Sequence, residues 1–236
     1  QIVAGGTVVF EGDTNSRISL SNNDVGDNNT LFGYAAGLNM HADADLNTFI
    51  GHQVGDASMT SAADKNTGVG ALALSSLTSA ANCTAVGYNV CGGGNPGDYS
   101  TAVGSYALSN ITGAGNTALG YAAGTALASG TFNVLIGHQA FDAANATETG
   151  NVAVGYGAMG AVDEGANSGD GDVNANYNIA LGVDALKGGD ITAVSADDID
   201  FVGNIAIGAY ALDATATNAQ TGTIAIGHSA LTALTS

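Results

Sequence analysis

The sequence has almost no positive charge. Its 236 residues include three lysines or arginines against 21 aspartates or glutamates, which gives a formal net charge of −18. Three cations cannot neutralise a useful number of phosphates, so we expect no binding to nucleic acid. No apolar run approaches the ~18 residues that a membrane span needs, so we also expect no direct membrane insertion.

Tryptophan is absent and proline occurs once, whereas glycine occurs 36 times. Collagen is excluded because glycine does not recur at every third residue and proline is almost missing. The composition also argues against a disordered acidic tail, because 45% of the residues are hydrophobic. So unusual a composition suggests internal repeats.

The chain contains eleven copies of a nine-residue segment of the form N-T-A-V-G-Y-x-A-L, numbered here as positions one to nine. Position five is glycine in every copy: Gly33, Gly51, Gly70, Gly87, Gly104, Gly120, Gly137, Gly155, Gly182, Gly208 and Gly227. A fixed core with spacers of variable length is typical of a solenoid. We therefore interpret the glycines as structural corners, where a Cβ would be forbidden.

Positions two and four carry mainly Thr, Val, Ile and Leu, which favour strands. Because they are two residues apart they share one face, and we expect that face to point inward. A shorter second strand should follow the glycine. Position three is alanine in seven copies and should point outward, where it predicts close contact between chains in a symmetric homo-oligomer. The predicted fold is an all-β, parallel β-solenoid of about eleven coils.

Two domains are predicted. Residues 1–28 form an N-terminal cap or connecting strand, and residues 29–236 form the β-solenoid repeat domain. The repeat domain carries two long acidic loops at 160–177 and 187–203. They leave adjacent coils at the same corner, so they should be neighbours in space.

These loops hold the candidate metal ligands. A Ca²⁺ site prefers oxygen ligands on flexible segments, as the sequence Asp170–Asn174 offers, but the spacing and terminal glutamate of an EF-hand are missing. A solvated acidic loop and a receptor-binding protrusion are the alternatives. The candidate ligands are Asp163, Asp170, Asp172, Asp197, Asp198 and Asp200. No other cofactor is indicated.

Histidine and tyrosine share the position after the corner glycine. In a trimer the copies of His52, His138 and His228 could each meet around a metal ion. The alternative is that these rings pack and hydrogen-bond beside Tyr34, Tyr88, Tyr121 and Tyr156.

Two further columns have structural interpretations. Position one is usually asparagine, and asparagines in register form ladders in which each amide bonds to the next coil. The only cysteines, Cys83 and Cys91, fall in one repeat. An extracellular setting would favour a disulfide between them, and two buried thiols are the alternative.

The repeat, as in Asn116–Gly124 and Asn151–Met159, resembles the head repeat of trimeric autotransporter adhesins and the related repeats of bacteriophage tail fibres. The resemblance covers about residues 29–231. It implies a left-handed parallel β-roll, three chains around a common axis, and attachment to a surface. That family carries no catalytic residues. The coils here are longer than the adhesin-head repeat.

We therefore expect a non-enzymatic structural and adhesive fibre, extracellular and located on a cell surface or virion. Its partners would be itself, as a homotrimer or fibre, and a cell-surface glycan or protein receptor. One alternative is an ice-binding solenoid, which needs an outward threonine array, whereas position two is expected to face inward. Another is a polysaccharide-degrading fibre, although Glu11, Glu148 and Glu164 suggest no catalytic pair.

Overall fold

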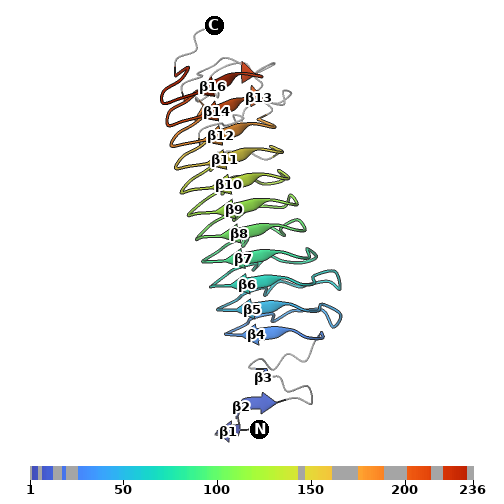
Figure 1. The fold of residues 1–236 in the computed structure, drawn as a ribbon. Coiled ribbons are helices and arrows are strands. Elements are labelled where there is room, and N and C mark those ends of the chain that lie inside the picture. The colour runs from blue at the N-terminus through green and yellow to red at the C-terminus, as the bar shows by residue number, and fades with distance from the viewer. Residues whose placement is uncertain are drawn as a thin grey trace.

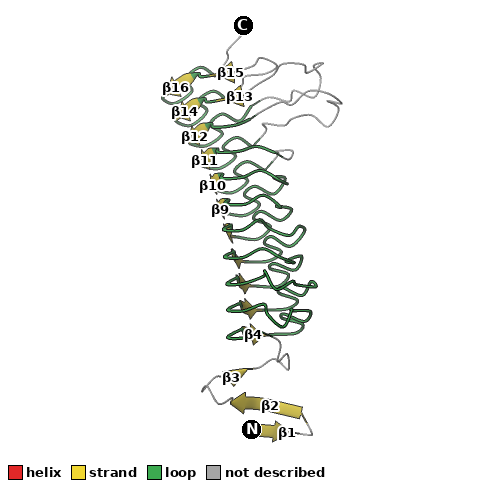
Figure 2. Ribbon diagram, turned by 90° about the vertical axis from the view of Figure 1, so that its right-hand side faces the viewer, coloured by secondary structure: helices red, strands yellow, loops and turns green. Residues whose placement is uncertain are grey.

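The computed structural model describes residues 2–4, 7–12, 18–19, 26–142, 147–160, 175–188, 201–213 and 220–232. Within these ranges the chain forms strands and turns and no helix. Figure 1 shows the repeats stacked into an elongated β-solenoid, and the turned view in Figure 2 places the strands on one side and the loops on the other. The predicted all-β, parallel β-solenoid is confirmed.

One sheet of eleven parallel strands runs the length of the stack, in the order β16-β14-β12-β11-β10-β9-β8-β7-β6-β5-β4. Each strand is three residues long and comes from one repeat. The strands are β4 (Thr30–Phe32), β5 (Thr48–Ile50), β6 (Thr67–Val69), β7 (Thr84–Val86), β8 (Thr101–Val103), β9 (Thr117–Leu119), β10 (Val134–Ile136), β11 (Val152–Val154), β12 (Ile179–Leu181), β14 (Ile205–Ile207) and β16 (Ile224–Ile226). Pairing keeps equal repeat positions side by side, as where Thr84 is the partner of Thr101.

Two smaller sheets lie outside this stack of strands. β13 (Phe201–Val202) and β15 (Gln220–Thr221) pair in parallel. At the N-terminus, β1 (Ile2–Ala4), β2 (Thr7–Gly12) and β3 (Ile18–Ser19) form an antiparallel sheet. This antiparallel sheet falls within the segment 1–28, whose role as a cap or connector stays a prediction.

The expected orientation of the strands is wrong. Position three is buried in every strand of the long sheet, whereas positions two and four are partly or largely exposed. The alanines at position three therefore line the interior and make no contact surface for another chain. Alternation of side chains fixes which positions share a face, but not which face is inside. Small side chains lie inside because the opposite wall of the coil is close.

That opposite wall includes positions eight and nine, and in most repeats a large residue on one wall faces a small residue on the other. Where position three is large, position nine can be glycine, as with Leu31 and Gly37 or Phe49 and Gly55. A Cβ on Gly55 would lie 2.7 Å from Phe49 Cε2. Where position three is alanine, position nine is often a fully buried larger residue, such as Leu108 or Met159. Most repeats are thus packed by large side chains opposite small ones. Ala118 and Gly124 are both small, and Leu108 and Leu135 of the neighbouring repeats lie where a side chain on Gly124 would be.

The corner glycines have a backbone geometry that other residues cannot adopt. Their φ angles run from +124° at Gly70 to +143° at Gly120. A Cβ on Gly120 would also lie 2.6 Å from the carbonyl carbon of Gly137, the corner glycine of the next repeat. Both the angle and the close approach require glycine at position five.

In the described part of each repeat no second strand follows the corner glycine, so that expectation is also wrong. Positions six to nine form turns, because positions seven and nine have positive φ angles in all repeats, for example +55° at Gln139 and +54° at Phe141. A pleated strand needs a negative φ angle at every residue, so a segment in which positive φ angles recur at every second residue cannot form one. They still bond to both neighbouring repeats: Gln139 N–H donates to Tyr121 O at 2.9 Å, and Phe141 N–H donates to Ala158 O at 2.9 Å.

The asparagine ladder is confirmed. Asn133 Oδ1 accepts from the backbone N–H of Asn151 at 2.9 Å, and Asn133 Nδ2 donates to Glu148 O at 2.8 Å. The same pattern links the fully buried asparagines of the later repeats. The ladder satisfies polar groups inside the solenoid that would otherwise be costly to bury.

Candidate functional site

The outward face of the long sheet is a regular surface that runs the length of the stack of strands. It consists of the side chains at positions two and four, which lie in two parallel columns. From β4 to β9 the first column is threonine, and from β10 to β16 it is valine or isoleucine. The second column is Phe, Ile, Val or Leu throughout, and no strand of this sheet contains a charged residue. We call these two columns the strand face.

The strand face is unusually apolar for an exposed sheet surface. Its exposed large residues are Phe32, Ile50, Leu119, Ile224 and Ile226. A solvated sheet face normally carries polar residues, and extended apolar patches mark places of contact. This face therefore replaces the alanine column as the surface on which another molecule can pack.

An aromatic column borders the strand face just beyond the corner glycines. Tyr121, His138 and Tyr156 stack with ring centroids 5.1 and 5.4 Å apart. Tyr34 stacks on His52 at 5.2 Å, and Tyr210 meets His228 edge to face at 5.8 Å. One of the two interpretations of the histidines was that they pack beside the tyrosines and bind no metal ion. The ring-to-ring packing seen here is the arrangement which that interpretation predicts.

Tyr106, like Tyr210, joins this column although it occupies position seven rather than position six. Its ring meets Tyr88 at 5.3 Å and Tyr121 at 6.0 Å, both edge to face. Desolvation, followed by the charges and the hydrogen bond of neighbouring tyrosines, raises the pKa of Tyr106. The spacing of the repeat alone did not predict that position seven would extend the column.

The described residues contain no group of three or more His, Cys, Asp or Glu side chains able to hold a metal ion. The six candidate calcium ligands Asp163, Asp170, Asp172, Asp197, Asp198 and Asp200 lie outside the described residues, as do most of the two acidic loops. Both the calcium site and a metal shared between three chains stay predictions.

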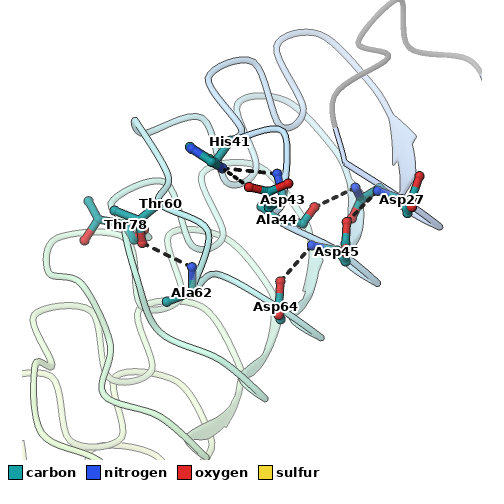
Figure 3. A network of polar contacts seen from close by, with 10 residues as sticks. Asp27, His41, Asp43, Ala44, Asp45, Thr60, Ala62, Asp64 and Thr78 are labelled. Carbon is teal, nitrogen blue, oxygen red and sulfur yellow. Dashed lines mark hydrogen bonds and ion pairs between the residues drawn. The ribbon is translucent and has the colours of Figure 1, made fainter.

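Acidic side chains cap the turn before each of several early repeats. The sequence analysis did not predict this role. Asp45 N–H donates to Asp64 Oδ1 at 2.7 Å, and Asp27 N–H donates to Asp45 Oδ1 at 2.5 Å (Figure 3). Nearby, His41 Nδ1 lies 3.6 Å from Asp43 Oδ2. Their recurrence two residues before position one was the available signal. These carboxylates satisfy backbone donors between repeats, so their role is structural.

Cys83 and Cys91 are both buried and carry free thiols in the structure. Cys83 Sγ donates to Gly97 O at 3.3 Å. Burial is the main cause that raises the pKa of each thiol, and the proximity of Cys83 adds to the rise at Cys91. Thiols that stay protonated are poor nucleophiles, which argues against cysteine catalysis. The disulfide stays a prediction.

The glutamates offer no pair for glycoside cleavage among the described side chains. Glu148 is buried, and its backbone carbonyl accepts from Asn133. The side chains of Glu11 and Glu164 lie outside the described residues. None of the described segments contains a helix long and apolar enough to cross a membrane. No protein-family profile, curated protein or solved structure matches this chain.

Proposed function

We propose that the protein is a non-enzymatic, adhesive fibre subunit that assembles as a homotrimer through its strand face. The observation that carries this proposal is the apolar, uncharged strand face on a chain of net charge −18. Three such chains repel one another wherever their acidic residues meet. The strand face is the long surface where chains can approach without that repulsion.

The periodicity of the face supports a copy of the same chain as its partner. Neighbouring strands of a sheet are separated by about 4.8 Å, so the columns repeat with that spacing. Another copy has the same rise and can keep its side chains in register along the whole stack. The resemblance to adhesin-head and tail-fibre repeats adds a left-handed β-roll, a three-fold arrangement, and a place on a cell surface or virion.

Two leucine variants test the assembly. Leu119 is 49% exposed on the strand face, and Leu38 is 61% exposed outside it. Leu119→Glu would place three carboxylates in the interface, so we expect it to dissociate the trimer in sedimentation equilibrium. Leu38→Glu should leave the trimer intact. A wild-type monomer at micromolar concentration, or equal behaviour of the two variants, would refute assembly through this face.

Ice binding is a second candidate, because the threonine column points outward and not inward as expected. Thr30, Thr48, Thr67, Thr84, Thr101 and Thr117 are adjacent in strict parallel register. A flat, regular array of hydroxyl and methyl groups is what such a function requires. Two results would favour ice binding over the trimer. The wild-type protein would be monomeric and show thermal hysteresis, and the Thr84→Lys variant would lose that activity.

A further inference from the structure

A third column of side chains lies at the residue directly before position one, which we call position zero. It is asparagine or glycine in six of the eleven repeats, including Asn28, Asn82, Gly115 and Gly150, and Leu46 and Lys65 occupy it in two others. Every member has a φ angle between +59° and +72°. Asparagine and glycine adopt this left-handed conformation at the lowest cost, so they are the residues that the backbone favours there.

Three repeats place a large aromatic residue at this unfavourable position. Tyr99, Phe132 and Tyr177 have φ angles of +62°, +59° and +60°. Their side chains are 68%, 67% and 65% exposed, so they gain little from burial. Leu46 and Lys65 share this conformation, so the φ angle alone does not distinguish the three residues. It is the aromatic side chain, left in solvent at the same position of alternate repeats, that indicates a role other than folding. We call these three residues the aromatic strip.

The strip has a regular spacing. Position zero is glycine in the two repeats that separate its members, namely at Gly115 and Gly150. Backbone hydrogen bonds keep the column aligned: Phe132 N–H donates to Ala114 O at 3.1 Å, and Tyr177 N–H donates to Thr149 O at 3.0 Å. Alternate repeats of a parallel stack are about 9.6 Å apart, twice the strand separation.

The glycines let the rings lie against the backbone. A Cβ on Gly115 would lie 2.7 Å from Phe132 Cδ1, and a Cβ on Gly150 would lie 2.7 Å from Tyr177 Cδ1. Each ring thus covers the glycine of the preceding repeat, and its exposure leaves the opposite side open to solvent. The residue before Tyr99 in the column is Asn82 and not a glycine. Packing against a glycine therefore does not explain why an aromatic residue occurs at Tyr99.

We propose that the aromatic strip binds an extended, neutral, β-linked polysaccharide that runs along the solenoid. In β-linked glucose and N-acetylglucosamine every ring substituent is equatorial, so the axial C–H bonds present apolar faces that stack on the electron-rich faces of aromatic rings. Alternate sugars of a cellulose-like or chitin-like chain recur with nearly the spacing of the three rings. The charge of −18 repels acidic polysaccharides and nucleic acids, which leaves neutral glycans as the ligand class.

This inference names a receptor class for the proposed adhesive function and rests on it for its biological meaning. The direct test is binding of the wild-type chain to insoluble cellulose and chitin, and to cellohexaose and chitohexaose by calorimetry. The double variant Phe132→Ala/Tyr177→Ala should bind at least about tenfold more weakly, which is the loss of one good stacking contact. Tyr34→Ala/Tyr156→Ala, which removes two exposed rings of the other column, should bind as the wild type does.

A second variant reads the site directly. The chain has no tryptophan, so Phe132→Trp introduces a single fluorescent reporter on the strip. Its emission should shift to shorter wavelength on addition of the hexaose that binds, whereas Tyr34→Trp should not respond. Thermal unfolding of all variants checks that each is folded.

The proposal is overturned if the wild type binds none of these glycans, if the Phe132→Ala/Tyr177→Ala variant keeps wild-type affinity, or if the control variant loses affinity equally. Sedimentation measured on the same samples separates this failure from failure of the proposed function. A trimer that binds no neutral glycan would refute the strip alone. A monomer that binds through the strip would refute the trimeric fibre alone.

Discussion

Asn151 Oδ1 accepts a hydrogen bond from the backbone N–H of Asn178 at 2.9 Å, although the two residues are 27 positions apart. Asn151 Nδ2 also donates to Ala175 O at 2.6 Å. The side chain is completely buried, so its removal would leave polar groups in an apolar interior. We expect Asn151→Ala to lower the free energy of unfolding by about 2–4 kcal/mol, which corresponds to two unmet groups. Urea unfolding followed by circular dichroism measures this loss.

The ladder is interrupted where position one is Cys83 and Ser100. Ser100 Oγ is buried and has no hydrogen-bond partner. We expect Ser100→Asn to raise the free energy of unfolding by about 1 kcal/mol, since the amide would supply the missing bonds between repeats. The reverse change, Asn133→Ser, should be destabilising. Equal destabilisation by both changes would show that the ladder cannot be extended through this repeat.

Corner glycines should tolerate no side chain. In Gly120→Ala the added Cβ meets the backbone of Gly137, and the φ of +143° is closed to alanine. We expect a loss of at least about 3 kcal/mol. Gly222→Asn is the matched control, because Gly222 has a φ of +66° and an added Cβ would meet nothing within 4 Å. That variant should stay within about 1 kcal/mol of the wild type. Differential scanning calorimetry compares the two.

The buried cysteines should make the fold weaker at alkaline pH. Burial raises the pKa of Cys83 above the ordinary value of 9.0, and it raises the pKa of Cys91 as well. The folded state therefore holds thiol protons that the unfolded state releases, so stability is complete below pH 9.0 and falls as the pH rises further. Cys91→Ala should reduce this decline, as measured by urea unfolding between neutral and alkaline pH. Tyr106, whose pKa is also raised, contributes equally to both proteins.

Asp142 predicts a pH dependence at the acidic end. Burial is the largest influence on its carboxyl group and raises the pKa above 3.8, against opposing effects from its own backbone, Gln139, His138 and Lys187. Folding thus disfavours the charged carboxylate, and this cost disappears as the pH falls through the raised pKa. Asp142→Asn should therefore raise the unfolding midpoint at neutral pH and have no effect well below pH 3.8. A benefit that persisted in acid would indicate a different cause.

The sequence predicted those features that depend on a repeated residue type. Invariant glycine at position five indicated a corner that excludes a Cβ, and asparagine at position one indicated a ladder between repeats. Both predictions depend on backbone chemistry that is the same in every repeat. The calcium site predicted at residues such as Asp170 and Asp198 belongs to segments outside the described residues.

The orientation of the strands could not be obtained in the same way. Ala118 and Leu119 alternate regardless of which one faces the interior. The decision depends on the distance to the opposite wall, where position nine supplies the larger side chain in most repeats. The sequence also did not point to Phe132 and Tyr177. The residue type at position zero varies from repeat to repeat, and its constant left-handed conformation becomes visible only in the φ angles.

The direction of the hydrogen bonds in the long sheet has a mechanical consequence. The strands lie across the stack, so the bonds between them run along its length, as between β11 and β12. A pull on the two ends of the stack would load the bonds between all repeats in series, and the end repeats, which have a neighbour on one side only, would separate first. The stack would then unfold in many small steps, and each step would release the chain length of one repeat. Such a molecule absorbs tension by lengthening gradually, where a protein loaded in shear would hold and then fail at once.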